Sequence, residues 1–167
     1  MPITESTTDM YYCLYASPLG EIIISSDGLA LTGLWFRGQK YECAGLAPAQ
    51  ENSGLPIFAQ CREWLDAYFS GRSLPALPPL APKGTEFQQR VWTALLKVPY
   101  GSTLSYGELA RQLGCKSARA VGSAVGRNPV SLLIPCHRIV GKNRSLTGYA
   151  GGLERKKYLL ELEGAIL

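Results

Sequence analysis

The sequence of 167 residues is 46% hydrophobic and 18% charged, which is typical of a globular protein with one domain or two small ones. No apolar run reaches the length of about 18 residues that a membrane-spanning helix needs, and residues 1–5 lack the features of a signal peptide. The five cysteines form no C-x-x-C pair and the chain has one histidine. We therefore expect no disulfide framework, no metal site, no membrane partner and a location in the reducing cytoplasm.

The net charge of +4 hides a strong difference between the two halves of the chain. Residues 1–82 carry four basic and eight acidic side chains, a net charge of −4, whereas residues 83–167 carry thirteen basic and five acidic side chains, a net charge of +8. This asymmetry indicates that the second half binds a polyanion. Solvated helix faces would produce the same asymmetry, so charge alone leaves both interpretations open.

Short β-type segments dominate the beginning of the chain. Tyr11–Tyr15, Glu21–Ser26 and Ala30–Phe36 are rich in β-branched or aromatic residues and are separated by turn sequences, which predicts an antiparallel meander. Apolar residues then recur at helical spacing from Ile57 to Tyr68, which predicts one amphipathic helix that ends near Gly71.

The four prolines of Ser73–Pro82 predict a linker between an N-terminal domain, residues 1–82, and a C-terminal domain, residues 83–167. After the linker, Thr85 and Ser105 each begin a sequence typical of a helix N-terminus, and these helices should end near Val98 and Leu113. Ser117 can cap a further helix that runs to about Arg127. The turn at residues 114–116 between the last two helices fits a helix-turn-helix, although many helix pairs share this pattern. The expected fold is α+β with two domains: a small antiparallel sheet with a helix, then a mainly helical part.

The helix predicted after Ser117 consists almost entirely of small residues. Gly122 and Gly126 each cost about 1 kcal/mol of helix propensity relative to alanine. A helix with so little bulk can bring its backbone close to another surface. That surface is either another helix of the core or a nucleic-acid groove, where Arg119 would be the one long side chain on the early turn.

The only histidine, His137, directly follows Cys136. A neighbouring base draws a cysteine toward the nucleophilic thiolate, so this pair is a candidate nucleophile and base. Adjacent side chains point to opposite faces of a strand, and a working pair therefore needs either a turn or a bridging water. Pro135 interrupts regular structure and permits either arrangement. A half-buried cysteine beside a surface histidine is the alternative.

The C-terminal half resembles the O6-alkylguanine-DNA alkyltransferase family, the methylated-DNA–protein-cysteine methyltransferases of the compact bacterial type. The resemblance covers residues 83–167 and rests on specific motifs, which are Phe87–Trp92, Pro99–Gly101, Ser105-Tyr106, Arg127–Pro129, Pro135–Arg138 and Gly148–Gly152. Residues 1–82 match only by the order and size of their elements.

The resemblance implies a single-use reaction in which Cys136 takes an alkyl group directly from O6 of guanine, and less readily from O4 of thymine. His137 would remove the thiol proton through a water, and an acidic residue would orient the imidazole. Leu162-Glu163-Gly164 matches the family's Glu-Gly pair, which selects Glu163 over the neighbouring Glu161. Asn128 would brace the turn before Cys136. No cofactor is implied.

The resemblance also implies that a monomer binds the minor groove of double-stranded DNA with the damaged base flipped out. Tyr106 would donate to the flipped base and Arg119 would fill the gap left in the duplex. Further substrate or DNA contacts are expected from Ala118, Gly122, Ser123, Arg138, Tyr149 and Ala150. Some members carry serine where this chain has Ala150, so only backbone contacts are expected there.

Two other functions compete with alkyl transfer. A DNA-damage-binding module would need no nucleophile, but Cys136 is present. A hydrolase with a Cys-His pair would leave the basic half and the helix of small residues unexplained, and it would show turnover with an ester substrate.

Overall fold

The computed structural model describes residues 9–165. Residues 1–5, in which we found no features of a signal peptide, lie outside the described residues. The first half contains a four-stranded sheet in the order β3-β2-β1-β4. Its strands are β1 (Met10–Ser17), β2 (Gly20–Ser26), β3 (Leu31–Phe36) and β4 (Ala49–Glu51). The antiparallel pairing of β1, β2 and β3 confirms the predicted meander, with Cys13 opposite Ile24 and Ile24 opposite Leu34.

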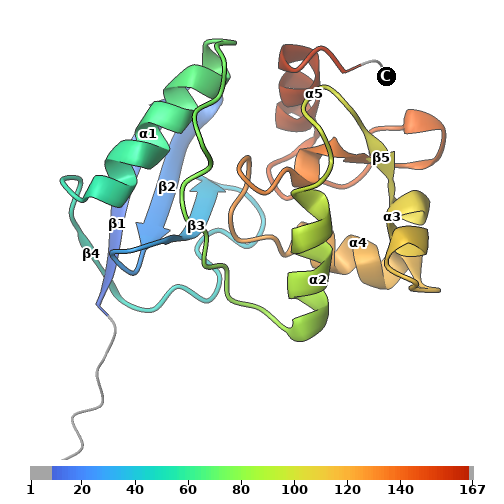
Figure 1. Ribbon diagram of the computed structural model, residues 1–167, viewed down its shortest axis with the longest axis horizontal. Coiled ribbons are helices and arrows are strands. Elements are labelled where there is room, and N and C mark those ends of the chain that lie inside the picture. Colours follow the sequence, from blue (N-terminus) through green and yellow to red (C-terminus); the bar gives the residue numbers. More distant parts are fainter. Residues whose placement is uncertain (1–8, 166–167) are drawn as a thin grey trace, which may run out of the picture.

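The sheet is mixed and not purely antiparallel, which corrects the prediction. The three residues of β4 pair in parallel with β1. A strand this short has no periodic pattern that sequence reasoning can detect. Helix α1 (Pro56–Phe69) covers one face of the sheet, as Figure 1 shows in green over blue. It buries its apolar side, including Phe58, Trp64 and Tyr68.

The predicted linker is not a free tether. Its end pairs with the edge strand β3, because the Leu31 N–H donates to the Pro79 carbonyl and the Ala81 N–H donates to the Leu31 carbonyl, each at 2.8 Å. Further along β3, the Leu34 N–H donates to the Pro129 carbonyl at 2.8 Å. The edge strand is thereby covered by the end of the linker and by a segment of the second half, which holds the two halves together.

The second half is mainly helical. Its elements are α2 (Glu86–Leu95), β5 (Leu104–Ser105), α3 (Tyr106–Gln112), α4 (Ala118–Gly126), a 3₁₀ turn (Cys136–Arg138), β6 (Ile139–Val140), a second 3₁₀ turn (Lys142–Arg144) and α5 (Leu153–Leu162). Strands β5 and β6 form a small parallel pair that the sequence did not predict.

Helix caps form where the sequence predicted them. Thr85 and Gln88 form a complete capping box at α2, and the Ser117 hydroxyl accepts from the Ala120 N–H at 3.0 Å at the start of α4. At α3 the box is not reciprocal, because the Glu108 carboxylate accepts from the Ser105 hydroxyl and not from its backbone.

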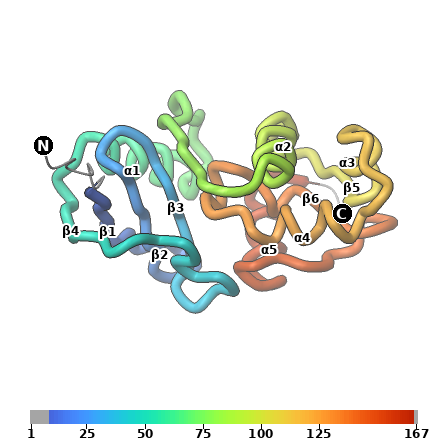
Figure 2. The backbone as a smooth tube through the Cα atoms, turned by 90° about the horizontal axis from the view of Figure 1, so that it is seen from below, coloured from blue at the N-terminus to red at the C-terminus, as the bar shows by residue number. Residues whose placement is uncertain are grey.

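The two halves lie side by side along the long axis of the molecule, as Figure 2 shows. Buried residues of both halves nevertheless belong to one continuous hydrophobic cluster. Within residues 9–165, no helix is long and apolar enough to cross a lipid bilayer.

Candidate active site

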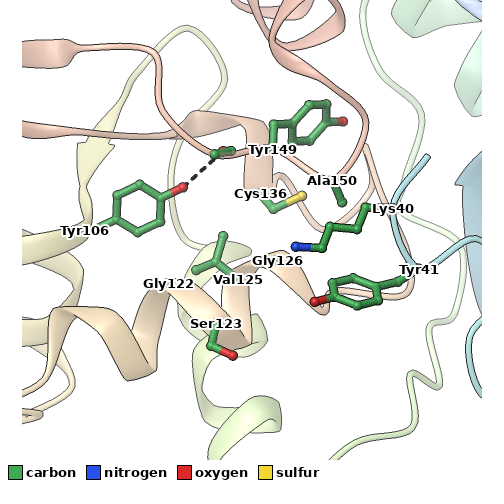
Figure 3. A pocket seen from close by; sticks show the side chains of 11 residues that line it. Lys40, Tyr41, Tyr106, Gly122, Ser123, Val125, Gly126, Cys136, Tyr149 and Ala150 are labelled. Carbon is green, nitrogen blue, oxygen red and sulfur yellow. Dashed lines mark hydrogen bonds between the residues drawn. The ribbon is translucent and has the colours of Figure 1, made fainter.

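A cavity of about 410 Å³ opens beside Cys136, between α4, the chain that precedes α5 and a loop of the first half (Figure 3). This volume is within the usual range for pockets that bind small molecules. The residues that line it are Lys40, Tyr41, Tyr106, Gly122, Ser123, Val125, Gly126, Cys136, Gly148, Tyr149 and Ala150.

The sulfur of Cys136 points into this pocket (Figure 3), although the residue is only 5% exposed. Pro135 breaks the extended chain, and Cys136 then begins a 3₁₀ turn that also contains His137. Burial raises the pKa of the thiol, whereas the Asn128 side chain and the positive charge of Lys156 act in the opposite direction. The thiol therefore needs a base before it can react at neutral pH.

His137 follows Cys136 in the 3₁₀ turn and is fully buried. Its Nε2 atom is 2.6 Å from Oε2 of Glu163, and its Nδ1 atom has no hydrogen-bond partner among the described residues. Burial lowers the pKa of His137, and this outweighs the opposite effect of the Glu163 carboxylate. A neutral imidazole that donates from Nε2 to Glu163 keeps a lone pair on Nδ1, so His137 can act as a base.

Glu163 follows α5 and is bound from several directions. Arg138 donates to Oε1 from Nε at 2.8 Å and to Oε2 from Nη2 at 3.1 Å, while the Tyr68 hydroxyl donates to Oε2 at 2.6 Å. Burial by itself would raise the pKa of Glu163, but the bonds from His137, Arg138 and Tyr68 lower it to about 2. The carboxylate is therefore ionised at neutral pH.

The structure gives Arg138 a place that differs from the predicted contact with DNA. The residue is only 7% exposed, and its guanidinium pairs with Glu163 and donates to the Val98 carbonyl at 2.8 Å. The prediction rested on the resemblance to a family, which does not give the direction of this side chain. A charged side chain next to a nucleophile can equally face inward when a carboxylate neutralises it.

Asn128 lies where the sequence predicted a brace. Its Nδ2 atom donates to the Ile134 carbonyl at 2.8 Å and its Oδ1 atom accepts from the Val130 N–H at 3.0 Å. One side chain thereby closes the segment between the end of α4 and Pro135, and every residue from Val130 to Val140 is buried. This fixes the position of Cys136 relative to α4.

Tyr106 forms one wall of the pocket. Its hydroxyl donates to the Thr147 carbonyl at 3.2 Å and to the Gly148 carbonyl at 3.1 Å, and Figure 3 shows the second bond. The pKa of Tyr106 is raised to about 12 by burial and by the nearby Cys136, so the phenol stays protonated. A Cβ atom on Gly148 would lie 3.3 Å from that hydroxyl, and the φ of +59° also favours glycine there.

Lys156 is a buried cation that the sequence analysis missed. Its Nζ donates to the carbonyls of Ile139, Thr147 and Gly148, the last two at 3.0 and 3.1 Å. Burial lowers its pKa to about 8. It thus holds the wall of the pocket against β6. Its neighbours Arg155 and Lys157 make the segment resemble a solvated basic run, so the sequence contained no signal for it.

Other residues predicted to contact substrate or DNA lie along α4 and the loop after β6. Gly122 and Ser123 line the pocket, and Ala118 and Arg119 lie nearer the start of α4 and are exposed. Tyr149 and Ala150 line the opposite wall. The Tyr149 hydroxyl is buried without a hydrogen-bond partner among the described residues.

The fold and site together define a class of protein with a reactive cysteine in a pocket beside a helix of small residues. The histidine that follows this cysteine is buried and paired with a glutamate. Residues 86–165 match the family described as 6-O-methylguanine DNA methyltransferase, DNA binding domain. Residues 10–82 match the family described as 6-O-methylguanine DNA methyltransferase, ribonuclease-like domain. The chain belongs to the 6-O-methylguanine DNA methyltransferase family.

Similar proteins span nearly the whole chain. The methylated-DNA–protein-cysteine methyltransferase of Haemophilus influenzae is 46% identical over 158 residues, which cover 93% of this chain and 87% of the relative. That of Mycobacterium leprae is 49% identical over 148 residues, which cover 88% of both chains. The crystal structure of Mycobacterium tuberculosis OGT in complex with DNA superposes with a TM-score of 0.85 at 42% identity, covering 92% of both chains.

Proposed function

We propose that this chain repairs DNA by moving an alkyl group from O6 of guanine, and less readily from O4 of thymine, to the sulfur of Cys136. The observation that carries the proposal is that the sulfur of Cys136 faces the pocket while the next residue, His137, is buried and paired with Glu163. The family and the methyltransferase names of its relatives support the same reaction.

In the proposed mechanism a water bridges the free Nδ1 of His137 and the thiol of Cys136. The imidazole takes the thiol proton through that water, and ionised Glu163 stabilises the imidazolium that forms. The thiolate attacks the alkyl carbon, so one carbon–sulfur bond forms as the carbon–oxygen bond to guanine breaks. The electron pair remains on the guanine, which Tyr106 assists as a hydrogen-bond donor and which then takes up a proton.

The product has no way back. A thioether has no route to hydrolysis, so each molecule would accept one alkyl group and would be consumed as a stoichiometric reagent. This separates the proposal from a Cys-His hydrolase, in which water releases the acyl group and the enzyme turns over.

The target base must leave the stack to reach the sulfur, at a cost of a few kcal/mol. We propose that α4 lies in the minor groove, where the small side chains of Ala118, Gly122 and Ser123 suit a narrow space, and that Arg119 fills the gap. Residues 83–167 would form the domain that binds DNA and residues 1–82 its partner domain. We further propose that the protein acts as a monomer in the cytosol, where its five thiols would stay free.

The first test is the intact mass of the protein after incubation with a duplex that contains one O6-methylguanine. We expect a single gain of one methyl group, mapped to Cys136 and absent from Cys136→Ala. Binding of the duplex without any gain in mass would overturn alkyl transfer and favour a damage-binding module. Repeated turnover of an ester would favour a hydrolase.

A further inference from the structure

The pocket around Cys136 has a wall that comes from the first half of the chain. Lys40 and Tyr41 lie in the loop after β3, and both side chains extend toward the cavity from the side opposite Tyr106 (Figure 3). The first half has a net charge of −4 and only four basic residues, and one of these, Lys40, extends into the pocket of the reactive sulfur. The mechanism above assigns neither residue a role.

This loop is fixed to the second half. The Lys40 N–H donates to the Ala150 carbonyl at 3.0 Å, so the loop is bound to the adjacent wall of the pocket, which the second half provides. Arg155 of α5 donates from Nη2 to the Arg37 carbonyl at 3.5 Å, where the loop begins, and from Nη1 to the Gly151 carbonyl at 3.0 Å. Tyr41 has a φ of +62°, a conformation that is uncommon for a residue other than glycine and that its surroundings must stabilise.

Two cations converge on the ring of Tyr41. The guanidinium carbon of Arg127, at the C-terminal end of α4, is 4.0 Å from the ring centroid, and Nζ of Lys40 is 5.1 Å from it. Both residues are exposed, and neither takes part in any ion pair among residues 9–165. Two like charges without a counterion repel each other, and an anion bound near both would relieve that repulsion.

We propose that Lys40 and Arg127, held in place by Tyr41, bind a DNA phosphate that flanks the flipped nucleotide. The inference rests on the proposed function. A base that enters the pocket brings its own sugar and neighbouring phosphates close to Lys40, which lines the pocket, and to Arg127, which contacts the same Tyr41 ring. The first half would then bind substrate directly, and the phosphate would be held by one residue from each half.

Salt dependence tests the number of charges that meet phosphate. The logarithm of the binding constant falls linearly with the logarithm of the salt concentration, and removal of one phosphate contact makes this negative slope shallower by about one. We expect this change for Lys40→Gln and for Arg127→Gln, with duplex binding weakened by about three- to tenfold at low salt. Lys97→Gln is the matched control, because this exposed lysine follows α2, which packs behind α4. It should leave the slope unchanged.

A second measurement separates phosphate from base. Alkyl transfer is timed with the duplex and with the free base O6-benzylguanine, which has no phosphate. For Lys40→Gln the ratio of the duplex rate constant to the free-base rate constant should fall by about three- to tenfold. An equal loss with both substrates would overturn the proposal, since Lys40 would then act on the base or on the thiol.

The phosphate itself can be identified with duplexes in which one phosphodiester next to the lesion is replaced by an uncharged methylphosphonate. At one of the two positions the replacement should weaken binding by the wild-type protein but should not weaken binding by Lys40→Gln any further. Such non-additivity is expected of a direct contact between Lys40 and that phosphate. Additive losses of affinity at both positions would overturn the proposed phosphate contact. Failure of the wild-type protein to transfer from either substrate would instead overturn the proposed function, whatever the binding data show.

Discussion

The carboxylate of Glu163 joins a histidine, an arginine and a tyrosine that come from separate parts of the chain. Glu163→Gln should leave the Arg138 guanidinium buried without a counterion and destabilise the protein by about 3–5 kcal/mol in urea unfolding. Alkyl transfer should slow as well, because the imidazolium loses its partner. Glu161→Gln is the control, since that side chain is 62% exposed and lies 3.9 Å from Lys157. It should cost about 0.5 kcal/mol or less, and an equal effect of both variants would contradict this account.

The single histidine makes the pH dependence of stability easy to assign. The pKa of His137 is lowered from 6.5 by burial, so below pH 6.5 the unfolded chain binds the proton more readily than the folded one. Stability should therefore fall as the pH drops from 6.5, by at most about 1.4 kcal/mol per pH unit. Urea midpoints between pH 8 and 5 measure this slope, which His137→Asn should abolish. A slope that persists in the variant would exclude His137 as its source.

Glu163 contributes at lower pH. Its pKa is lowered from 4.5 to about 2, so its contribution is present above pH 4.5 and is lost as the pH falls toward 2. Glu163→Gln should remove this loss of stability between pH 4.5 and 2, measured as urea midpoints over that range.

The glycines of helix α4 lower its stability but allow another surface to approach its backbone closely. A Cβ on Gly122 would lie 3.6 Å from the Tyr106 ring, an ordinary contact, so Gly122→Ala should fit and raise stability by up to about 1 kcal/mol. The added methyl group would stand at the rim of the pocket and should slow transfer from duplex more than from free O6-benzylguanine. Thermal melting and the two rates decide this. An unchanged duplex rate would show that the small residue serves packing alone.

Elements with strong local signals were predictable from the sequence, whereas those held by distant partners were not. Thr85 and Ser117 cap their helices through bonds within four residues, so their patterns are visible in the sequence. Strand β4 has three residues and exists because β1 lies beside it. The end of the proline-rich linker likewise takes its conformation from β3, which is far from it in the sequence.

The same distinction holds for the site. Cys136, His137 and Glu163 were found through their motifs, but Tyr68 repeats with the apolar residues of α1 and therefore resembled a core aromatic. Its polar end faces the second half, and only the packing of the two halves reveals this. Arg138 was predicted to contact DNA or substrate, but its side chain faces inward to Glu163. The sequence gives the charge of this residue and not the direction of its side chain.

Tyr68 tests how far the two halves work as one molecule. Tyr68→Phe keeps the ring but removes the donor to ionised Glu163, so we expect a loss of about 1.5–3 kcal/mol in urea unfolding. The pH profile of alkyl transfer should shift as well, because the carboxylate that sets the basicity of His137 changes. Tyr15→Phe removes a similar bond, to Asp66 at 2.6 Å, on the exposed surface of the first half. That variant should leave the pH profile unchanged, and the same result for Tyr68→Phe would refute the coupling.

The bond between Tyr68 and Glu163 also bears on when the protein becomes reactive during its synthesis. Cys136 is made before Glu163, so a growing chain carries the sulfur for a time without the carboxylate that supports its base. Until α1 and the end of α5 have docked, His137 has no oriented carboxylate beside it and cannot act on Cys136 as it does in the assembled molecule. Alkyl transfer, which uses each sulfur only once, should therefore begin only after both halves have been made and have docked.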